Sequence, residues 1–341
     1  MFANYFEKVV RGNNLETDEM ESVMSTIMEG KVSECQIAGM LIGLRMKGET
    51  IDEITGAARV MRKKAININC NNNYSIDTCG TGGDGSGTFN ISTTVALVLA
   101  GAGLTVAKHG NRSVSSKSGS ADVLEKLGVK LNLKPEQVEK CVNEIDIGFL
   151  FAPHFHKAMK YAVKPRKELG MRTIFNVLGP LTNPAFVNYQ VLGVYHPTLV
   201  RPLAEVLKNL GVKSAMVVNG HNSVDELTLS GENKVAYLNE GKIKEMLITP
   251  EQIGIERASL KDLAGGQPED NKNIIIDILN GKIGPHRNVV LFNSAAAFVV
   301  TGYADSWKQG VKIAEDIIDS GKALSKLNQL VEFTNSQELV V

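Results

Sequence analysis

Cysteine is scarce in this chain of 341 residues, which contains only Cys35, Cys70, Cys79 and Cys141. The four are scattered, with no C-x-x-C spacing, so the sequence indicates neither a zinc site nor a disulfide framework. Cys79 stands beside a glycine-rich segment, but no sequence context marks a base that would activate it. We interpret Cys79 as a small filler residue rather than a nucleophile.

Net charge is also missing, because 37 lysines and arginines balance 37 aspartates and glutamates. No global field therefore favours nucleic acid or an anionic membrane, and any anion site must be local. No apolar run approaches the roughly eighteen residues of a transmembrane helix, and the first residues contain no apolar signal-peptide core. We expect a cytoplasmic protein that binds neither nucleic acid nor membrane.

Glycine, in contrast, is concentrated in one segment. Residues 80–87 contain five glycines, and an apolar segment typical of a helix follows from Ser92 to Ala102. Glycine lets successive N–H groups converge on one anion, and the absent side chains let that anion approach closely. The positive N-terminal end of the helix would add to the same site. The pattern predicts a phosphate-binding loop.

This glycine loop fits neither common nucleotide-binding type. Gly80, Gly82 and Gly85 match G-x-G-x-x-G, but a dinucleotide fold also needs an apolar strand before the loop and an acid after the next strand. The strand expected at 104–107 is instead followed by the cationic segment 108–112, and no G-K-[ST] marks a Walker loop. A second anion site is therefore predicted, with small donors from Ser113, Ser115, Ser116, Ser118 and Ser120.

The texture of the sequence changes near residue 70. Residues 1–70 have helical periodicity, with capping boxes at Ser33 to Gln36 and Thr50 to Glu53. Beyond Asn71, short strands alternate with helices, which predicts an α/β domain at 71–341 with a mostly parallel central sheet. We expect strands at 104–107, 147–151, 190–195, 214–218 and 235–238, and helices at 121–127, 135–145, 154–169, 199–210, 271–279 and 306–318.

Two further segments carry charged side chains near these loops. Asp225 and Glu226 follow an apolar strand, where adjacent carboxylates repel each other unless a cation such as magnesium lies between them. The alternative is an ordinary solvated turn. Arg166 and Arg172 precede a turn shaped by two prolines, and either arginine could bind a carboxylate in a two-pronged contact or lie on the surface.

Taken in order along the chain, these motifs resemble those of the anthranilate phosphoribosyltransferase family. The resemblance runs from the helical N-terminus to near the C-terminus, and no departure is seen at the positions that carry it. The motifs are residues 80–84, 90–93, 108–112, 172–176, 179–184 and 225–226.

This resemblance implies a small all-helical N-terminal domain and a larger α/β domain of the nucleoside phosphorylase and phosphoribosyltransferase type. Part of 160–184 would join the helical domain, through which the family usually forms homodimers. The implied reaction of tryptophan biosynthesis transfers the phosphoribosyl group of 5-phospho-α-D-ribose 1-diphosphate, here called phosphoribosyl diphosphate, to the amine of anthranilate and releases pyrophosphate.

The resemblance also implies roles for individual residues. Magnesium, as two ions per subunit, would be held by Ser92, Asp225 and Glu226. Anthranilate would contact Gly80, His109, Asn111, Arg166 and Pro180, with Arg166 on its carboxylate. Phosphoribosyl diphosphate would contact Gly80, Gly83, Asp84, Thr88, Asn90, Ile91, Ser92, Thr93, Lys108, Ser115, Ser116 and Ser120.

Two rival functions remain open at this point. A pyrimidine nucleoside phosphorylase of the same fold class would need no magnesium, so Asp225 and Glu226 beside Ser92 argue against it. A non-catalytic relative that binds nucleic acid should have a basic face and eroded metal ligands, whereas this chain is neutral overall and keeps both carboxylates.

Overall fold

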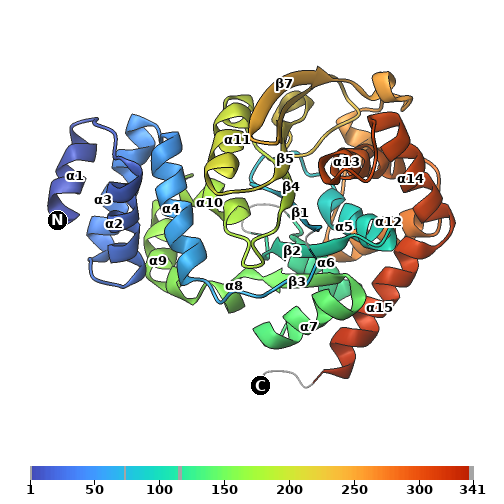
Figure 1. The fold of residues 1–341 in the computed structure, drawn as a ribbon, viewed down its shortest axis with the longest axis horizontal. Coiled ribbons are helices and arrows are strands. Elements are labelled where there is room, and N and C mark those ends of the chain that lie inside the picture. The colour runs from blue at the N-terminus through green and yellow to red at the C-terminus, as the bar shows by residue number, and fades with distance from the viewer. Residues whose placement is uncertain (1, 73, 114–116, 338–341) are drawn as a thin grey trace.

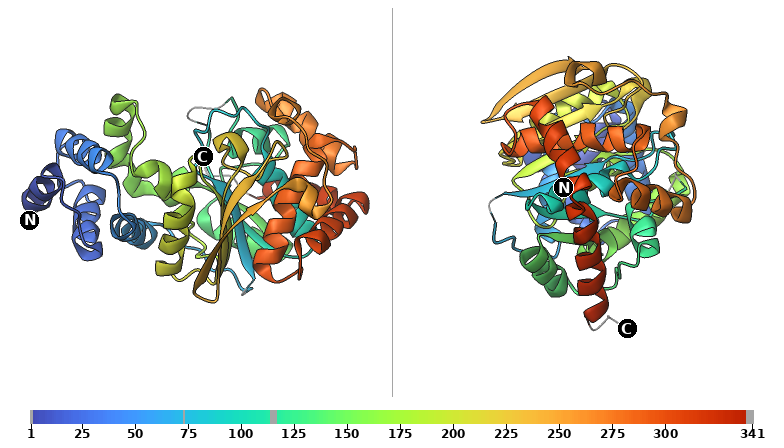
Figure 2. Two further views of the ribbon diagram at one scale, coloured as in Figure 1. Left: turned by 90° about the horizontal axis from the view of Figure 1, so that it is seen from above. Right: turned by 90° about the vertical axis from the view of Figure 1, so that its right-hand side faces the viewer.

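The computed structural model describes residues 2–72, 74–113 and 117–337. Four helices come first in the chain and form a bundle at one end of an elongated molecule (Figures 1 and 2). Two of them begin at the predicted capping boxes, in which Gln36 N–H donates to Ser33 and Glu53 N–H donates to Thr50. The four are α1 (Phe2–Val10), α2 (Thr17–Met28), α3 (Glu34–Lys47) and α4 (Ile51–Lys64).

A seven-stranded sheet lies at the centre of the remaining chain, in the order β3-β2-β1-β4-β5-β6-β7. The strands from β1 to β5 are parallel, and β6 and β7 join antiparallel at one edge. This confirms the predicted fold class of a helical N-terminal part and a mostly parallel α/β part. The strands are β1 (Ser75–Gly80), β2 (Thr105–Gly110), β3 (Ile147–Phe151), β4 (Tyr189–Gly193), β5 (Ser214–Asn219), β6 (Asn233–Asn239) and β7 (Lys242–Ile248).

Further helices follow α4 in the chain, and most of them cover the two faces of this sheet, whereas α9 packs against α2 and α3. They are α5 (Ile91–Gly101), α6 (Ser120–Lys126), α7 (Pro135–Ile145), α8 (Ala152–Phe155), α9 (Lys160–Leu169), α10 (Phe175–Leu181), α11 (Val200–Asn209), α12 (Pro268–Leu279), α13 (Pro285–Thr301), α14 (Trp307–Asp319) and α15 (Lys322–Ser336). Among the described residues, no helix combines the length and apolar character needed to cross a membrane.

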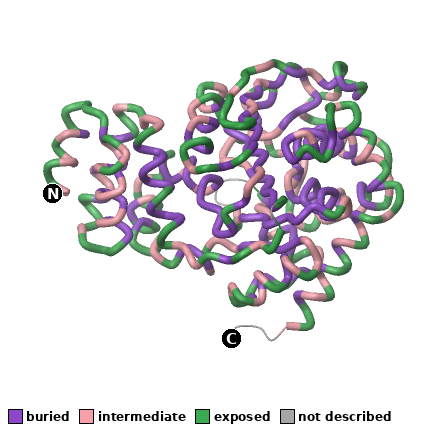
Figure 3. Tube along the Cα trace, viewed as in Figure 1, coloured by how far each residue is buried: buried purple, intermediate pink, exposed green. Residues whose placement is uncertain are grey.

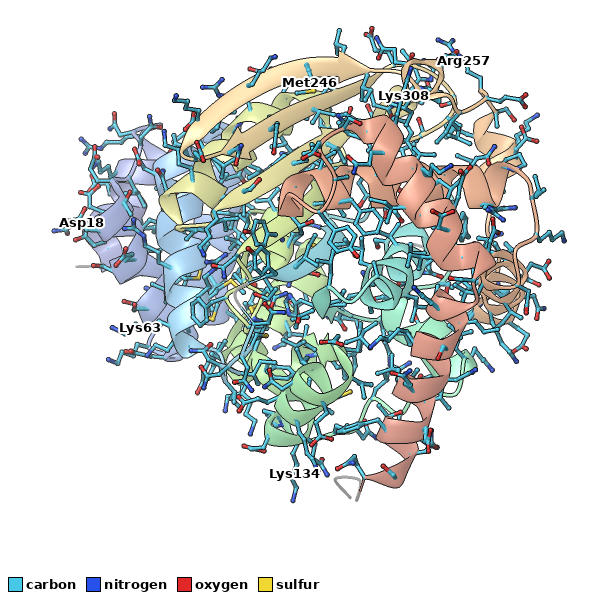
Figure 4. The ribbon with its side chains drawn as sticks, turned by 45° about the vertical axis from the view of Figure 1, so that its right-hand side comes forward. Asp18, Lys63, Lys134, Met246, Arg257 and Lys308 are labelled. Carbon is cyan, nitrogen blue, oxygen red and sulfur yellow. The ribbon has the colours of Figure 1, made fainter. Side chains whose placement is uncertain are left out.

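Side chains alternate between two cores across the sheet. Val191, Met216 and Val218 pack with α5 and α12 to α15, whereas Leu192 and Val217 pack with α10, α11 and the N-terminal helices. Buried segments accordingly run from the sheet into the inner side of the bundle (Figure 3). Charged side chains lie outside, as Asp18 and Lys63 do on the bundle and Lys134 and Lys308 do on the α/β part (Figure 4).

Some elements differ from those expected from the sequence. The helix predicted at 154–169 is broken into α8 and α9, with His156 in a non-helical conformation (φ −110°, ψ 57°). Strand β2 extends to Gly110, so Lys108 and His109 lie within the strand rather than after it. Helices α10, α13 and α15 and strands β1 and β7 were not among the predicted elements, and Pro180 lies within α10 where a turn was expected. Strand β1 runs directly into the glycine loop.

Candidate active site

The glycine loop and the two carboxylates meet at one edge of the sheet. Strands β1 and β4 are neighbours there, and the chain continues from β1 to one side of the sheet and from β4 to the other. Such a reversal opens a crevice at the carboxyl ends of the strands, where α/β proteins bind ligands. The glycine loop follows the carboxyl end of β1, and Asp225 and Glu226 follow that of β5, as this rule requires. Lys108 and His109 lie within β2, and Arg166 and Pro180 lie on α9 and α10, between β3 and β4.

Buried amide side chains fix the segment that carries the carboxylates, residues 220–227, which we call the carboxylate loop. At its start, Asn219 Nδ2 donates to the carbonyl of Val194 at 2.6 Å. At its end, Asn293 of α13 accepts from Leu227 N–H at 3.1 Å and donates to the Leu227 carbonyl at 2.9 Å. The loop is therefore held in place at both ends rather than being a free surface turn.

Two glycines make room for this loop. Gly80 and Gly193 are partners across β1 and β4. A Cβ at position 193 would lie 1.5 Å from the Asp225 carbonyl oxygen, and one at position 80 would lie 2.3 Å from Asp225 Oδ2. Gly80, predicted from its place in the glycine loop, thus also has a steric role, and Gly193 is a site residue that the sequence pattern did not reveal.

The carboxyl groups of Asp84, Asp225 and Glu226 are partly buried and lie close to one another. Asp225 Oδ2 accepts the N–H of Gly82 at 2.6 Å, and Asp84 Oδ2 accepts the N–H of Asp225 at 3.3 Å. Burial, followed by the nearby charges of Asp84 and Glu226, raises the pKa of Asp225 well above its usual value. Burial also raises the pKa of Glu226 to about 7, against the opposing effect of Lys108. A cation here would relieve the cost of these buried negative charges.

The crest of the glycine loop presents free hydrogen-bond donors. Gly82 and Gly83 both have left-handed backbones, with φ of 69° and 71°. Within the described part of the chain, the N–H groups of Gly83, Asp84 and Gly85 have no hydrogen-bond partner. A Cβ at Gly82 or Gly85 would meet nothing within 4 Å. Consecutive free N–H groups facing open space form the type of concavity that binds an anion.

The first turn of α5 adds donors to the same place. Asn90 precedes the helix and makes no side-chain cap, and Thr93 is buried with its Oγ1 unpartnered among the described residues. Ser92 N–H donates to Glu226 Oε1 at 3.2 Å, and Lys108 Nζ lies 3.3 Å from Ser92 Oγ and donates to the Thr78 carbonyl at 2.6 Å. The structure therefore brings Ser92, Thr93 and Lys108 together with Glu226.

The other residues predicted to contact phosphoribosyl diphosphate lie in more varied surroundings. Ile91 is buried in the core, so only its backbone is available to a ligand. Thr88 forms an isolated bridge with Ala264 and lies 3.3 Å from Ser86 through its hydroxyl. Ser120 begins α6 and donates to the Asn111 carbonyl at 3.3 Å. Ser115 and Ser116 lie outside the described residues.

Asn90 is held by partners that were not predicted. Its Oδ1 accepts from Ser118 Oγ at 3.2 Å and from Asn271 Nδ2 at 2.9 Å, and its Nδ2 donates to the Ser118 carbonyl. Asn271 is buried on α12, nearly two hundred residues away in the chain. Its role could not be seen in the sequence because nothing local links α12 to the glycine loop.

A second group of predicted residues lies around α9 and α10. The Arg166 guanidinium lies 5.0 Å from the centre of the Phe175 ring, is partly buried and has no hydrogen-bond partner among the described residues. Pro180 lies within α10, and its carbonyl accepts from Gln190 Nε2 at 2.7 Å. An arginine held on an aromatic ring with its donors unused is suited to binding a carboxylate.

His109 borders this group and is neutral. Burial lowers its pKa to about 3, its ring bonds to the Gly179 carbonyl, and its Nε2 has no partner among the described residues. His156 lies next to it, with ring centres 5.1 Å apart, and burial lowers the pKa of His156 to about 4. His156 was missed because, in the sequence, it resembles a packing residue near a helix start.

A buried carboxylate joins the two groups. Asn183 Nδ2 donates to Asp77 Oδ2 at 2.7 Å and to the Ala107 carbonyl at 2.8 Å, while His109 N–H donates to Asp77 Oδ1 at 3.3 Å. Burial raises the pKa of Asp77 to about 6. Strands β1 and β2 and the α10 turn are thus fixed relative to one another by one polar cluster. Asp77 could have been suspected, because it is an acid inside a strand.

A surface cleft of about 330 Å³ lies away from these groups, at the amino ends of the strands. It is lined by Asn71, Asn72, Tyr74, Thr105, Val142, Asn143 and Asp146. Asn143 bonds to the backbone of residues 69 and 71, and Asp146 pairs with Lys326. Because these polar groups already have partners, we assign no site there.

Comparison with known proteins identifies the family. Residues 3–65 match the helical bundle domain of a glycosyl transferase family, and residues 72–324 match its a/b domain. A curated relative from Petrotoga mobilis, named anthranilate phosphoribosyltransferase, is 59% identical over 98% of this chain and 97% of its own length. The chain belongs to the anthranilate phosphoribosyltransferase family.

Solved structures with the name of this family agree in fold. The anthranilate phosphoribosyltransferase of Thermus thermophilus is 43% identical, with a TM-score of 0.93 over 97% of this chain and 99% of that one. The Saccharomyces cerevisiae enzyme, solved in complex with PRPP and Mg, is 28% identical, with a TM-score of 0.91 over 98% of both chains. The yeast enzyme has also been solved with 4-fluoroanthranilate.

Proposed function

We propose that this anthranilate phosphoribosyltransferase binds phosphoribosyl diphosphate at the glycine loop and joins its ribosyl carbon to the amine of anthranilate. The observation that carries this assignment is the set of N–H groups at Gly83, Asp84 and Gly85, which have no partner among the described residues, beside the partly buried carboxyl groups of Asp225 and Glu226. Backbone N–H donors alone suit any phosphate group. Such donors next to partly buried acids suit a diphosphate that arrives with a metal ion.

Magnesium fits the carboxyl groups of this site. Magnesium is commonly held by one or two carboxylates together with substrate phosphates, and no three acidic, histidine or cysteine side chains of the described residues converge into a complete site. We propose that Ser92, Asp225 and Glu226 hold it, with the diphosphate supplying other oxygens. Bound magnesium would stabilise the charge that develops on the leaving pyrophosphate.

We further propose two magnesium ions per subunit. A bound cation would favour the ionised forms of Asp225 and Glu226, whose pKa values burial raises. Together with Asp84 they would then bring three negative charges to the crevice, and the diphosphate adds more. One divalent ion and Lys108 could not balance that charge, which supports a second ion. The yeast relative solved with PRPP and Mg supports the metal itself.

The acceptor would lie between α9, α10 and the end of β2. Arg166 is the partner we propose for the anthranilate carboxylate, because its donors are unused and Phe175 fixes its plane. His109 and Pro180 would form the walls of the aromatic slot, and Gly80 and Asn111 would border it. The relative solved with 4-fluoroanthranilate supports an acceptor of this shape and charge.

In the proposed reaction, the amine nitrogen forms a bond with ribosyl C1 while the bond from C1 to the diphosphate oxygen breaks. The electron pair of the broken bond leaves with pyrophosphate. The amine proton passes to solvent or to the released pyrophosphate. With a pKa of about 3, His109 is too weak a base to take that proton near neutral pH. Catalysis would therefore rest on positioning and on stabilisation of the leaving group.

The larger organisation is proposed on the same basis. We place a domain boundary near residue 70, with α9 and α10 joining the bundle, because α9 contacts α2 and α3 and α10 contacts α4. A homodimer through the helical domain is supported by the exposed apolar side chains of Val10 and Met46, which are 64% and 84% accessible. Tryptophan biosynthesis in the cytoplasm is the proposed setting.

The decisive experiment follows the fluorescence of anthranilate with phosphoribosyl diphosphate, with and without magnesium. We expect anthranilate to be consumed only when both are present. A parallel reaction with thymidine or uridine and phosphate should release no free base. Release of a pyrimidine without magnesium would contradict the proposed transferase function and would support a pyrimidine nucleoside phosphorylase instead.

The carboxylate loop supplies a variant for the same assay. Changing Asp225→Asn together with Glu226→Gln should lower turnover by at least about a hundredfold, the scale of losing a major electrostatic stabiliser. The fold should survive, since removing buried negative charge is not itself destabilising. Turnover close to that of the unchanged protein at limiting magnesium would exclude these residues from the mechanism.

A further inference from the structure

Arg172 contacts the crest of the glycine loop from outside the donor site. Its guanidinium donates to the Gly83 carbonyl. The two ends of the loop are fixed differently, by backbone bonds from Thr81 N–H to the Gly193 carbonyl at 3.0 Å and from Gly265 N–H to the Gly87 carbonyl at 2.9 Å. Arg172 therefore holds the loop between these two ends, one residue after Gly82, whose N–H is bound by Asp225 Oδ2.

An aromatic ring fixes the arginine in turn. The Arg172 Cζ lies 4.0 Å from the centre of the Tyr195 ring, a cation–π contact that also sets the plane of the guanidinium. Tyr195 follows β4, and its N–H donates to Thr81 Oγ1 at 3.1 Å. The arginine, its aromatic platform and the start of the glycine loop thus form one connected unit.

Peptide geometry shows what this contact does to the loop. A trans peptide is planar, so its C=O and the following N–H point in opposite directions. When Arg172 holds the Gly83 carbonyl, the N–H of Asp84 is directed to the other side, and this N–H is one of the free donors of the crest. If that peptide turned over, a carbonyl oxygen would replace a donor and would repel the diphosphate.

We propose that Arg172 is a positioning residue that orients the peptide between Gly83 and Asp84 for binding of the diphosphate, with Tyr195 as its platform. The proposal rests on the function proposed above. It also chooses between the two arginines left open by the sequence: Arg166 binds the acceptor carboxylate, and Arg172 acts on the donor loop. Because Arg172 follows α9 by only a few residues, the segment that carries Arg166 also supports the donor site.

The test is a double-mutant cycle with direct binding. Calorimetry with phosphoribosyl diphosphate and magnesium is run on the unchanged protein, Arg172→Ala, Tyr195→Leu and the double variant. Arg172→Ala should weaken binding by about ten- to a hundredfold, the range of a lost hydrogen bond from a charged group. Tyr195→Leu keeps the charge but removes the platform, so it should weaken binding in the same direction. The double variant should bind no more weakly than Arg172→Ala, because the two act as one unit.

Controls separate positioning from general damage. Arg201→Ala removes an exposed arginine that pairs with Glu205 on α11, and it should leave binding unchanged. Arg172→Lys keeps a donor but loses the flat stacking surface, so it should recover part of the affinity. The KM for anthranilate should remain nearly constant in every variant, and the melting temperatures should stay close to that of the unchanged protein.

The outcomes are distinguishable. If the unchanged protein binds no phosphoribosyl diphosphate with magnesium, the proposed function fails. If it binds but Arg172→Ala binds equally well, the positioning role fails. If Arg172→Ala raises the KM for anthranilate and leaves the affinity for phosphoribosyl diphosphate intact, Arg172 binds the carboxylate of anthranilate instead. If the effects of Arg172→Ala and Tyr195→Leu on binding are fully additive, the two residues act independently.

Discussion

Arg166 brings a positive charge into a partly buried slot, where its guanidinium has no hydrogen-bond partner among the described residues, and burial lowers its pKa. A charge in this position gains most from a ligand of opposite charge. Arg166→Ala should raise the KM for anthranilate about ten- to a hundredfold, because a hydrogen bond between charged groups is worth roughly 1.5 to 3 kcal/mol. Steady-state kinetics should show little change in the KM for phosphoribosyl diphosphate. A change only in the KM for phosphoribosyl diphosphate would contradict the proposal that Arg166 binds the carboxylate of anthranilate.

The space at Gly193 leads to a second prediction. A methyl group there would overlap the carbonyl of Asp225, so Gly193→Ala should displace the carboxylate loop and lower turnover by about a hundredfold or more. Gly101→Ala is the matched control, because its Cβ would lie 2.9 Å from Ala323 N, away from the site. That variant should lose about 1 to 3 kcal/mol of stability and keep its turnover per folded molecule. Equal loss of turnover in both would point to general misfolding.

At the scale of single residues, the sequence predicts those site residues that are charged and lie near the ends of strands. Lys108, Asp225 and Glu226 were found in this way, and the structure brings them together. Asn183, Asn271 and Asn293 were not found, because an amide acts through partners that only the fold brings close. Their hydrogen bonds cross between segments that have no periodic or spacing relation in the chain.

Helices were predicted best where a local sequence motif marks the residue at which they begin. The capping boxes gave the starts of α3 and α4, and α7 has the predicted bounds of 135–145. Strand β1 looked weak because Ser75, Asp77 and Thr78 are polar, yet all three are buried between β2 and β4. Tertiary hydrogen bonds satisfy two of these side chains, because Asn183 donates to Asp77 and Thr78 Oγ1 donates to the Ser92 carbonyl. Helix α13 is apolar on almost every side, so it lacks the periodicity that marks a surface helix.

The capping box of α4 is unusual because its glutamate is fully buried. Glu53 accepts from Thr50 N–H at 2.8 Å and from Leu15 N–H at 2.9 Å, and it pairs with Lys47 at 2.8 Å. Glu53→Ala should cost about 3 kcal/mol or more of unfolding free energy, because it leaves two N–H groups without a partner and removes the carboxylate that pairs with the Lys47 amine. That amine would keep only its bonds to Asn14 Oδ1 and the Gly48 carbonyl.

Urea unfolding would measure this cost. Gln36→Ala is the matched control, since Gln36 has the same position in the exposed capping box of α3, and it should cost about 1 kcal/mol or less. If the two variants lose the same stability, the buried network around Glu53 contributes nothing beyond capping.

The whole molecule joins its helical bundle to the sheet through one apolar core. That core includes Met24 and Leu41 of the bundle, Leu178 of α10 and Leu192 of β4, so no polar layer separates the two parts. The residues of α9 and α10 that we propose to bind anthranilate are consequently held against the same framework as the glycine loop and the carboxylate loop. This arrangement explains why a site assembled from distant segments can be well defined, and why the sequence alone could not show how its halves meet.

The free energy of unfolding of the whole chain should also depend on the His109 and His156 pair. Burial lowers their pKa values to about 3 and about 4, below the usual value of about 6.5. Between about pH 6.5 and pH 4, the unfolded chain therefore binds more protons than the folded one. Stability is fully present above about pH 6.5 and should fall as the pH drops, by up to about 1.4 kcal/mol per pH unit for each histidine.

Urea unfolding across this pH range would test the linkage. His156→Asn keeps an N–H donor for the Thr182 carbonyl but does not titrate, so the slope of stability against pH should be smaller by about one proton. Asp77, with its pKa raised to about 6, acts in the opposite direction in both proteins, and comparing the two slopes cancels its effect. If His156→Asn has the same slope as the unchanged chain, the buried histidine takes up its proton in the folded state as readily as in the unfolded one, and the neutral pair beside the acceptor slot would have to be abandoned.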